Sequence, residues 1–309
     1  MNPIDSIKAT GFYKGINNWL SATHFTKDRI PLKRTLAILF KQLAKDNLSQ
    51  KGSAMAFSFL LSIFPTIIFL FTIIPYTPLP DAEGDFMDFL NNHLPPSLYN
   101  TVHETIEDII MIPHGGLMSF GFLTALFSVT SGIRAMIEAF NACYSTTEKR
   151  GFFHLLLVST GLALFLSAIF IIAIALSIGV RLYTSLLQAD VLHNQPIFGD
   201  MLLLFKYITL FMLFYLAISF IYYTAPTIHD KWSFFSIGSL IASLTAILFT
   251  VGFFYYISIF NSYNKLYGSI GAFIGIMMWF YIFSMVLLFG FEVNASIHMA
   301  RQEVKAKTV

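Results

Sequence analysis

Charged residues and cysteine are scarce in this sequence of 309 residues. Only 12% of the residues are charged and 56% are hydrophobic, whereas soluble domains carry roughly 25% charged residues. So few charges cannot cover the surface of a soluble protein of this size, which indicates a membrane protein with several spans. The single cysteine, Cys143, excludes an intrachain disulfide and any metal site built from several cysteines. We therefore expect neither a resident metal nor another cofactor.

Several functional motifs are also missing. There is no Walker motif, so the chain is not expected to hydrolyse ATP itself. The segment 103–107 fails the spacing of a zinc protease because position 107 is Glu instead of His, and the segment 81–85 lacks the glycine placement of a calcium loop. No apolar core of a cleavable signal peptide precedes residue 54. The first hydrophobic run is thus expected to direct insertion.

Long apolar runs dominate what remains. Each of six is long enough to cross a bilayer as a helix, and they cover about 54–74, 116–133, 152–178, 201–223, 234–257 and 268–291. The sequence therefore predicts an all-α membrane protein with six transmembrane helices over 54–300. A basic amphipathic segment, 1–53, precedes this domain, and a tail, 301–309, follows it.

The distribution of cations predicts the orientation. With both termini in the cytoplasm, only Arg181, Lys206 and Lys265 of the 19 Lys and Arg residues fall outside. Cytoplasmic loops carry such an excess of Lys and Arg. The connection 75–115 would then be an outer loop, and it contains seven acidic residues and no Lys or Arg. We expect two short helices in it and a multi-pass protein of the bacterial inner membrane.

The N-terminal segment contains an apolar stripe on a basic helix. Leu32, Leu36, Leu39 and Leu43 follow helical spacing, with lysines and an arginine around them. Such a helix suits an anionic membrane surface. The alternative is a helix packed against the cytoplasmic end of the bundle.

Two features of the spans point to close packing or to a polar pathway. Pro65 lies in the middle of the first span and removes a backbone hydrogen bond; beside it, Ser58, Ser62 and Thr66 share one helix face. These hydroxyls either satisfy the freed carbonyls or line a polar path. Small residues at four-residue intervals predict close helix packing, and these are Gly238 with Ala242 and Gly271 with Gly275.

A group of charged and polar residues is predicted at the inner boundary. Arg134 and Glu138 are four residues apart at the end of the second span, and Glu292 and Asn294 end the sixth. Arg134 either reaches the interface or is held inside the bundle by a carboxylate. Our hypothesis is that Arg134 bridges Glu138 and Glu292 and holds an inner gate shut.

Three segments carry a family resemblance, namely 54–75, 131–152 and 267–296, together with the motif TAPTIHDKW. Over about residues 35–300 the chain resembles the YihY/BrkB family of bacterial inner-membrane proteins, which has an older ribonuclease BN label and virulence or serum-resistance labels. The resemblance implies signature positions at Pro65, Arg134, Asn141, Tyr144, Trp279, Tyr281, Gly290, Glu292 and Asn294.

The function expected from these features is transport or translocation of a lipid-like or small amphipathic substrate without an ATPase. The alternatives are a small-solute or ion transporter and an envelope scaffold that binds a protein partner. Ribonuclease activity is not expected, because the cytoplasmic carboxylates are scattered. We expect contacts with membrane lipids and none with nucleic acid, and the residues indicate no oligomeric state.

Overall fold

We describe a computed structural model of the chain. It describes residues 31–73, 115–144, 150–190, 196–228, 232–259 and 269–308, and isolated positions between them. The N-terminal 30 residues and nearly all of the predicted outer loop 75–115, with its two short helices, lie outside the described residues.

All regular structure in this part of the chain is helical, apart from an isolated bridge at Pro31. The helices are α3 (Leu32–Lys45), α4 (Leu48–Ile73), α7 (Gly115–Cys143), α8 (Phe152–Asp190), α9 (Pro196–Thr224), α10 (Ile237–Ile259) and α12 (Ser269–Thr308). Five of them are long and apolar enough to cross a membrane, namely α4, α7, α8, α9 and α12. The sixth predicted span corresponds to α10, whose apolar stretch, Ile237–Phe253, is shorter.

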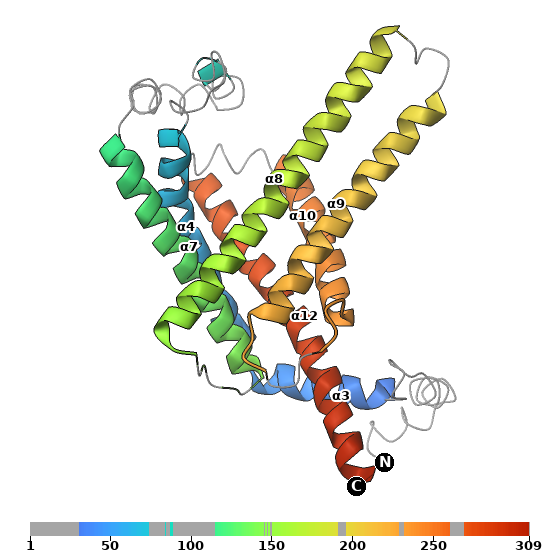
Figure 1. The fold of residues 1–309 in the computed structure, drawn as a ribbon. Helices are drawn as coiled ribbons and strands as arrows, with labels where there is room; N and C mark the ends of the chain where they lie inside the picture. Colours follow the sequence, from blue (N-terminus) through green and yellow to red (C-terminus); the bar gives the residue numbers. More distant parts are fainter. Residues whose placement is uncertain are drawn as a thin grey trace.

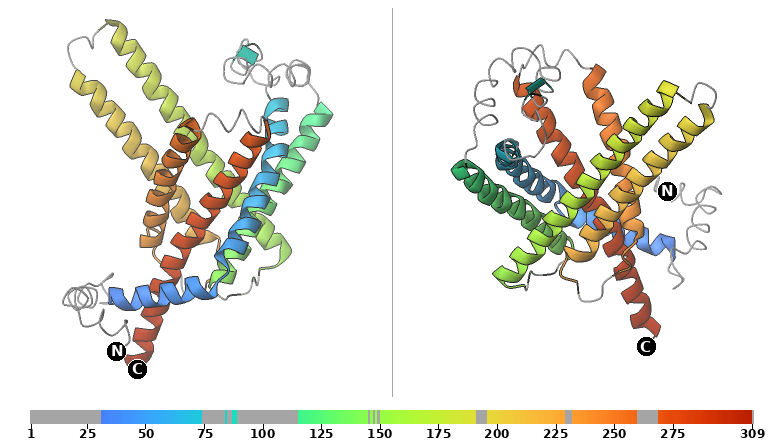
Figure 2. Two further views of the ribbon diagram at one scale, coloured as in Figure 1. Left: turned by 180° about the vertical axis from the view of Figure 1, so that it is seen from behind. Right: turned by 45° about the horizontal axis from the view of Figure 1, so that its top comes forward.

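The six helices from α4 to α12 alternate in direction along one axis (Figures 1 and 2). The helix α4 runs away from α3, α7 returns toward it, and the remaining four continue this alternation. As a result α3 and the C-terminal part of α12 lie at the same end of the bundle. This end is called the α3 end below.

The core lies where α7, α9 and α12 meet. The Phe140 ring stacks on Phe291 with their centroids 4.5 Å apart, and the Tyr222 ring meets both edge-on at 5.6 and 5.9 Å. All three side chains are fully buried. Burying aromatic side chains of this size makes a large contribution to core packing, so this cluster joins the three helices near the α3 end.

The other helices are arranged around this core. The helix α4 packs along α7 and α12, α10 packs along α12, and α8 packs against α7 and α9. In contrast, α8 and α9 leave many large apolar side chains exposed, among them Phe170, Ile171, Leu204 and Phe205. In a membrane protein such surfaces face lipid, because hydrocarbon does not penalise apolar exposure.

The helix α3 crosses the end of the bundle beneath the other helices (Figure 1). Its Leu39 is buried, and it packs against α12. Arg34 forms an ion pair with Glu303, and Gln42 contacts the sulfur of Met299 at 3.3 Å. The apolar stripe of this segment is thus used for packing on α12, while its Lys33, Lys41 and Lys45 stay exposed.

Candidate functional site

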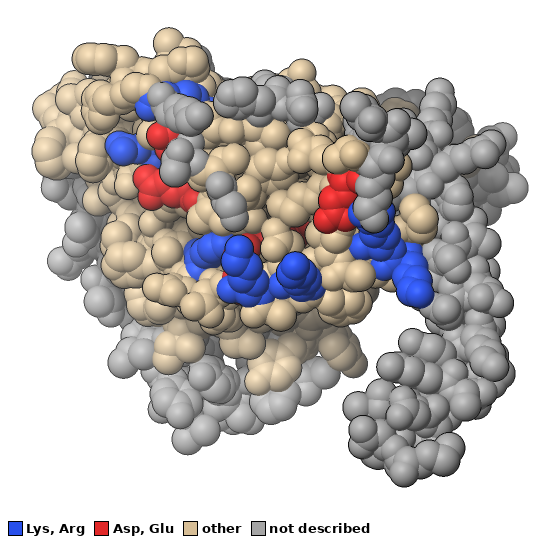
Figure 3. Space-filling model, turned by 90° about the horizontal axis from the view of Figure 1, so that it is seen from below, with Lys and Arg blue, Asp and Glu red and all other residues tan. Residues whose placement is uncertain are grey.

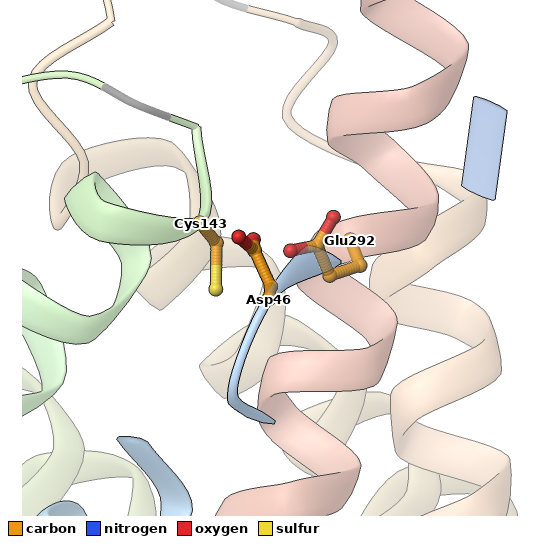
Figure 4. Close-up of side chains that lie close together, drawn as sticks. All are labelled: Asp46, Cys143 and Glu292. Carbon is orange, nitrogen blue, oxygen red and sulfur yellow. The ribbon is translucent and has the colours of Figure 1, made fainter. Parts of the chain in front are cut away.

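Three ionisable or metal-ligating side chains meet inside the α3 end. Asp46 lies directly after α3, Cys143 is the last residue of α7, and Glu292 belongs to α12. One carboxylate oxygen from each acid and the Cys143 sulfur all lie within 4.8 Å of one another. Figure 4 shows the Asp46 carboxylate between the Cys143 thiol and the Glu292 carboxylate. We call these three residues the acid–thiol cluster.

A break between two helices positions Asp46. Its backbone leaves the helical region, with φ −88° and ψ 129°, while its N–H still donates to the Gln42 carbonyl of α3. The helix α4 then begins at Leu48. The carboxylate therefore projects from a corner that the helix α3, lying across the bundle end, brings under α7 and α12.

Glu292 is the most unusual member of the cluster. The residue has no exposed surface, and no described residue donates a hydrogen bond to either of its carboxylate oxygens. A buried charge without a partner costs several kcal/mol in general. Such a side chain is retained for a reason other than stability, or is neutralised by a bound cation or proton.

Lys51 supplies a cation at the edge of the cluster. Its Nζ lies 3.3 Å from Asp46 Oδ2 and 3.5 Å from Cys143 Sγ. The ammonium therefore contacts the Asp46 carboxylate and the Cys143 sulfur, and no such contact with Glu292 is formed. The Lys51 and Asp46 side chains keep 19% and 14% of their surface exposed, so this side of the cluster is accessible to water.

The predicted bridge from Arg134 to Glu138 and Glu292 is wrong. The Arg134 guanidinium lies 5.8 Å from the centre of the Phe152 ring of α8, Glu138 is exposed, and neither acid forms an ion pair with Arg134. The reason is helix geometry. Arg134 precedes Cys143 by nine residues, which is about 2.5 turns and about 13 Å along the axis. It thus faces the opposite side of α7 from the residue that reaches Glu292.

Asn294 binds the start of α10 and takes no part in the acid–thiol cluster. Its Oδ1 accepts from the Gly238 N–H at 2.8 Å, and its Nδ2 donates to Ser236 Oγ at 2.7 Å. The first N–H groups of a helix lack partners within it. A side chain of α12 therefore caps α10.

The polar face of the first span bonds within its own helix. The hydroxyls of Ser58, Ser62 and Thr66 donate to the carbonyls of Ala54, Phe59 and Ser62. α4 continues as a helix through Pro65. The three hydroxyls are half-buried, and none of them reaches the Leu61 carbonyl that Pro65 leaves free.

Of the small residues, Gly238 and Ala242 lie where α10 crosses α12. A Cβ at Gly238 would come within 2.2 Å of the Gly290 carbonyl oxygen, and one at Gly290 within 2.6 Å of the Ala242 Cβ. Gly275 is half-buried in α12, and of Gly271 only its place in that helix is described.

A second polar network links the α7–α8 connection to the α9–α10 connection at the α3 end. Glu148 accepts two side-chain hydrogen bonds from Arg150, each 2.8 Å, and one from Asn141 at 2.9 Å. Arg150 also donates to the Ala225 carbonyl, and the Thr227 N–H donates to Asn141. The hydrogen bonds and charge of Arg150 outweigh burial and lower the pKa of Glu148 from 4.5 to about 2.

Sequence reasoning did not identify Asp46, Lys51 or Cys143 as parts of a site. Nothing in their local sequence marks them, because they come from three segments that only the folded chain brings together. The one feature that could have indicated Asp46 is the two-residue break, 46–47, between the helical patterns of α3 and α4. Such breaks place side chains at helix corners.

The chain is similar to known membrane proteins over most of its length. A family model described as "Virulence factor BrkB" matches residues 39–308. The putative ribonuclease-like protein YfkH of Bacillus subtilis is 28% identical over 85% of this chain and 95% of its own length. The UPF0761 membrane protein MS0032 of Mannheimia succiniciproducens is 24% identical, with 85% and 89% covered. No solved structure matches. Because the family model covers so much of the sequence, the chain belongs to the BrkB family of membrane proteins.

Proposed function

We propose that this chain is a transporter or translocator of a lipid-like or small amphipathic substrate. In this proposal six helices, α4, α7, α8, α9, α10 and α12, cross the bacterial inner membrane, with both termini in the cytoplasm. The alternation of helix directions and the basic residues of the α3 end support this topology.

The observation that carries the proposal is the buried carboxylate of Glu292. It lies in a helix apolar enough to span the membrane, has no exposed surface and receives no hydrogen bond from a described residue. Ionisable residues within spans are costly, and they commonly mark pathways for substrates, ions or protons. Structural packing alone gives no reason to keep this charge.

The apolar surface supports a substrate of lipid character. A shallow hollow between α4 and α7 is lined by Phe69, Met118, Phe122 and Leu123, with Ser119 beside them. An acyl chain fits such a surface better than a hydrated solute does. The exposed faces of α8 and α9 would receive further lipid contacts.

The energy for net transport would come from a gradient or from passive exchange, because the chain contains no Walker motif. We further propose that the chain is not an enzyme and does not bind nucleic acid. Hydrolysis of RNA needs carboxylates or metal ligands that a phosphodiester can approach. Glu292 is enclosed by protein, and its neighbour Asp46 keeps only 14% of its side-chain surface exposed and is paired with Lys51, which leaves little access for a phosphodiester. The exposed acids Glu138 and Glu303 are not members of the acid–thiol cluster.

The test is reconstitution of the purified chain into lipid vesicles, followed by measurement of lipid scrambling and of solute flux. We expect the wild type to accelerate transfer of a fluorescent phospholipid between leaflets relative to empty vesicles. Glu292→Gln keeps the side-chain volume and removes the charge, so we expect it to lower this rate at least tenfold.

Glu303→Gln is the matched control, because it makes the same change on the same helix at an exposed ion pair. Its rate should stay within twofold of the wild type. Wild-type protein that moves neither lipid nor solute would overturn the proposal. Co-purification of a stoichiometric protein partner in that case would favour the scaffold function, whereas solute flux without lipid transfer would favour a small-solute transporter.

A further inference from the structure

The acid–thiol cluster has the donor atoms of a metal site. It combines two carboxylate oxygens and one sulfur from three separate elements, within 4.8 Å of one another. Tetrahedral zinc binds such ligands at about 2.0–2.3 Å, which places the donor atoms about 3.3–3.8 Å apart. The carboxylate oxygens of Asp46 and Glu292 would need to move by about 1 Å, through rotation of their side chains, to reach this spacing.

A second observation points to a ligand. Glu292 is fully buried and aimed into the cluster, and no described residue donates to its oxygens. A metal ion would supply the missing positive charge. It would also leave a fourth position for water, as in open sites with three protein ligands.

The Lys51 ammonium stabilises the acid–thiol cluster when no metal ion is bound. Its ammonium lies 3.3 Å from Asp46 and 3.5 Å from Cys143, where it offsets part of the negative charge. A lysine side chain is flexible and can move its ammonium into water, and that of Lys51 already has 19% of its surface exposed. The ammonium and a metal ion would therefore compete for the same two side chains.

We propose that Asp46, Cys143 and Glu292 bind a thiophilic divalent transition-metal ion of the zinc class, in exchange for the Lys51 ammonium. Binding forms one metal–sulfur bond and two metal–oxygen bonds, and the thiol proton passes to water. The mixed oxygen and sulfur set disfavours Mg²⁺ and Ca²⁺, which prefer oxygen ligands only.

A bound metal would connect the α3–α4 corner, the end of α7 and the middle of α12. Its effect would be to hold these elements together at the α3 end. Regulation of transport by this connection rests on the proposed function, whereas metal binding itself does not.

The test is a titration of the full-length, tag-free protein in detergent with Co²⁺, whose thiolate complexes absorb by charge transfer. Cys143 is the only cysteine in the chain, so a thiolate band reports this site alone. We expect one equivalent to saturate the band and Zn²⁺ to abolish it, since zinc binds such sites more tightly than cobalt.

Four variants sharpen the test. Cys143→Ser should remove the band, and Glu292→Gln should weaken Co²⁺ binding at least tenfold. Lys51→Met keeps all three ligands and removes the competing ammonium, so it should tighten binding severalfold. Glu303→Gln, an exposed acid on the same helix as Glu292, should bind like the wild type.

A wild-type protein that shows no thiolate band in excess Co²⁺ would overturn the inference. An unchanged affinity in Glu292→Gln, or a weaker one in Lys51→Met, would also contradict it. The vesicle assay separates the two proposals. If Co²⁺ binds at Cys143 but the vesicles show no transport, the metal site stands and the proposed function fails. If the vesicles show transport but the protein shows no thiolate band, the proposed function stands and the metal site fails.

Discussion

Single side chains decide how the buried polar groups of this protein are satisfied. Asn294 of α12 is the clearest case, since it accepts from the Gly238 N–H and donates to Ser236 at the start of α10. It is 4% exposed, so water cannot replace these bonds. One amide therefore joins two helices and caps one of them.

Asn294→Ala should lower the free energy of unfolding by about 1–3 kcal/mol, because it leaves the buried Gly238 N–H without its acceptor, whereas the Ser236 hydroxyl keeps its bonds with Ser239. Thermal unfolding in detergent measures this loss. Ser58→Ala is the comparison, since that hydroxyl only bonds within its own helix, and it should change stability little. Equal effects of the two substitutions would contradict the assigned role of Asn294.

Glu148 predicts a pH dependence of stability. Arg150 holds the pKa of this carboxyl at about 2 in the folded protein, below its ordinary value of 4.5. The folded state thus favours the carboxylate, and its stabilisation is complete above about pH 4.5 and lost as the pH falls toward 2. Thermal midpoints of the wild type should drop over this window.

The difference between the wild type and Glu148→Gln isolates this effect, because other acids titrate in both proteins. We expect the gap in thermal midpoint to be largest near neutral pH and to narrow below pH 4.5. A gap that stays constant down to the lowest pH would exclude the contribution of Glu148.

At the scale of elements, the crossing of α10 and α12 depends on two glycines. A Cβ on Gly290 would lie 2.6 Å from both the Ala242 Cβ and the Tyr222 hydroxyl, and 2.8 Å from the Gly238 carbonyl oxygen. These neighbours are backbone atoms and buried side chains, so they cannot move away easily. The two backbones approach closely only because no side chain separates them.

Gly290→Ala should therefore force the helices apart and lower stability by about 3 kcal/mol, at the upper end of the usual cost of overpacking. The measurement is again the thermal midpoint in detergent. Gly161→Ala in α8 is the control, since a Cβ there meets nothing within 4 Å. It should be neutral or slightly stabilising, because alanine favours helices by about 1 kcal/mol over glycine.

The helix α3 has an apolar face that packs on α12 and a basic face that stays exposed. Its leucine stripe packs on α12, with the ion pair of Arg34 and Glu303 beside it. Both partners are substantially exposed, at 30% and 53% of their side-chain surface, so the pair contributes little to stability. The apolar contacts hold this helix across the bundle end, and its exposed lysines are left to face the membrane surface or the solvent.

At the scale of the whole molecule, many basic side chains of the described residues gather at one end. Seen from below in Figure 3, Lys and Arg side chains gather at the α3 end, with a few acids among them. Lys33, Lys41 and Lys45 of α3 are exposed there. Lys206 belongs to the first half of α9, a helix that begins at the opposite end. In a membrane this asymmetry favours the α3 end inside.

Labelling of introduced cysteines tests this orientation. In a Cys143→Ser background, Asp85→Cys, in the predicted outer connection 75–115, should react with a membrane-impermeant maleimide applied to intact spheroplasts. Lys41→Cys should react only after the membrane is opened. The reverse pattern would mean that the α3 end faces outward, and the proposed topology would be wrong.

The helical segments followed from the sequence because their cause is local. Each of the six apolar runs falls on one helix and extends past its ends by no more than about three residues, since a bilayer requires every backbone polar group to be bonded within its own segment. The α3 helix was also predicted from its leucine spacing. Whether its stripe contacts lipid or α12 was not decided by the spacing, because both surfaces are apolar.

The sequence by itself determined the class of this protein, since low charge and long apolar runs admit few other solutions. It also placed Glu292 in a predicted group of charged and polar residues at the end of the sixth span. Only the tertiary structure decided what surrounds that charge. The direction in which each helix faces its neighbours depends on packing between segments far apart in the chain, and this packing brings Asp46, Lys51 and Cys143 to Glu292 and takes Arg134 to Phe152.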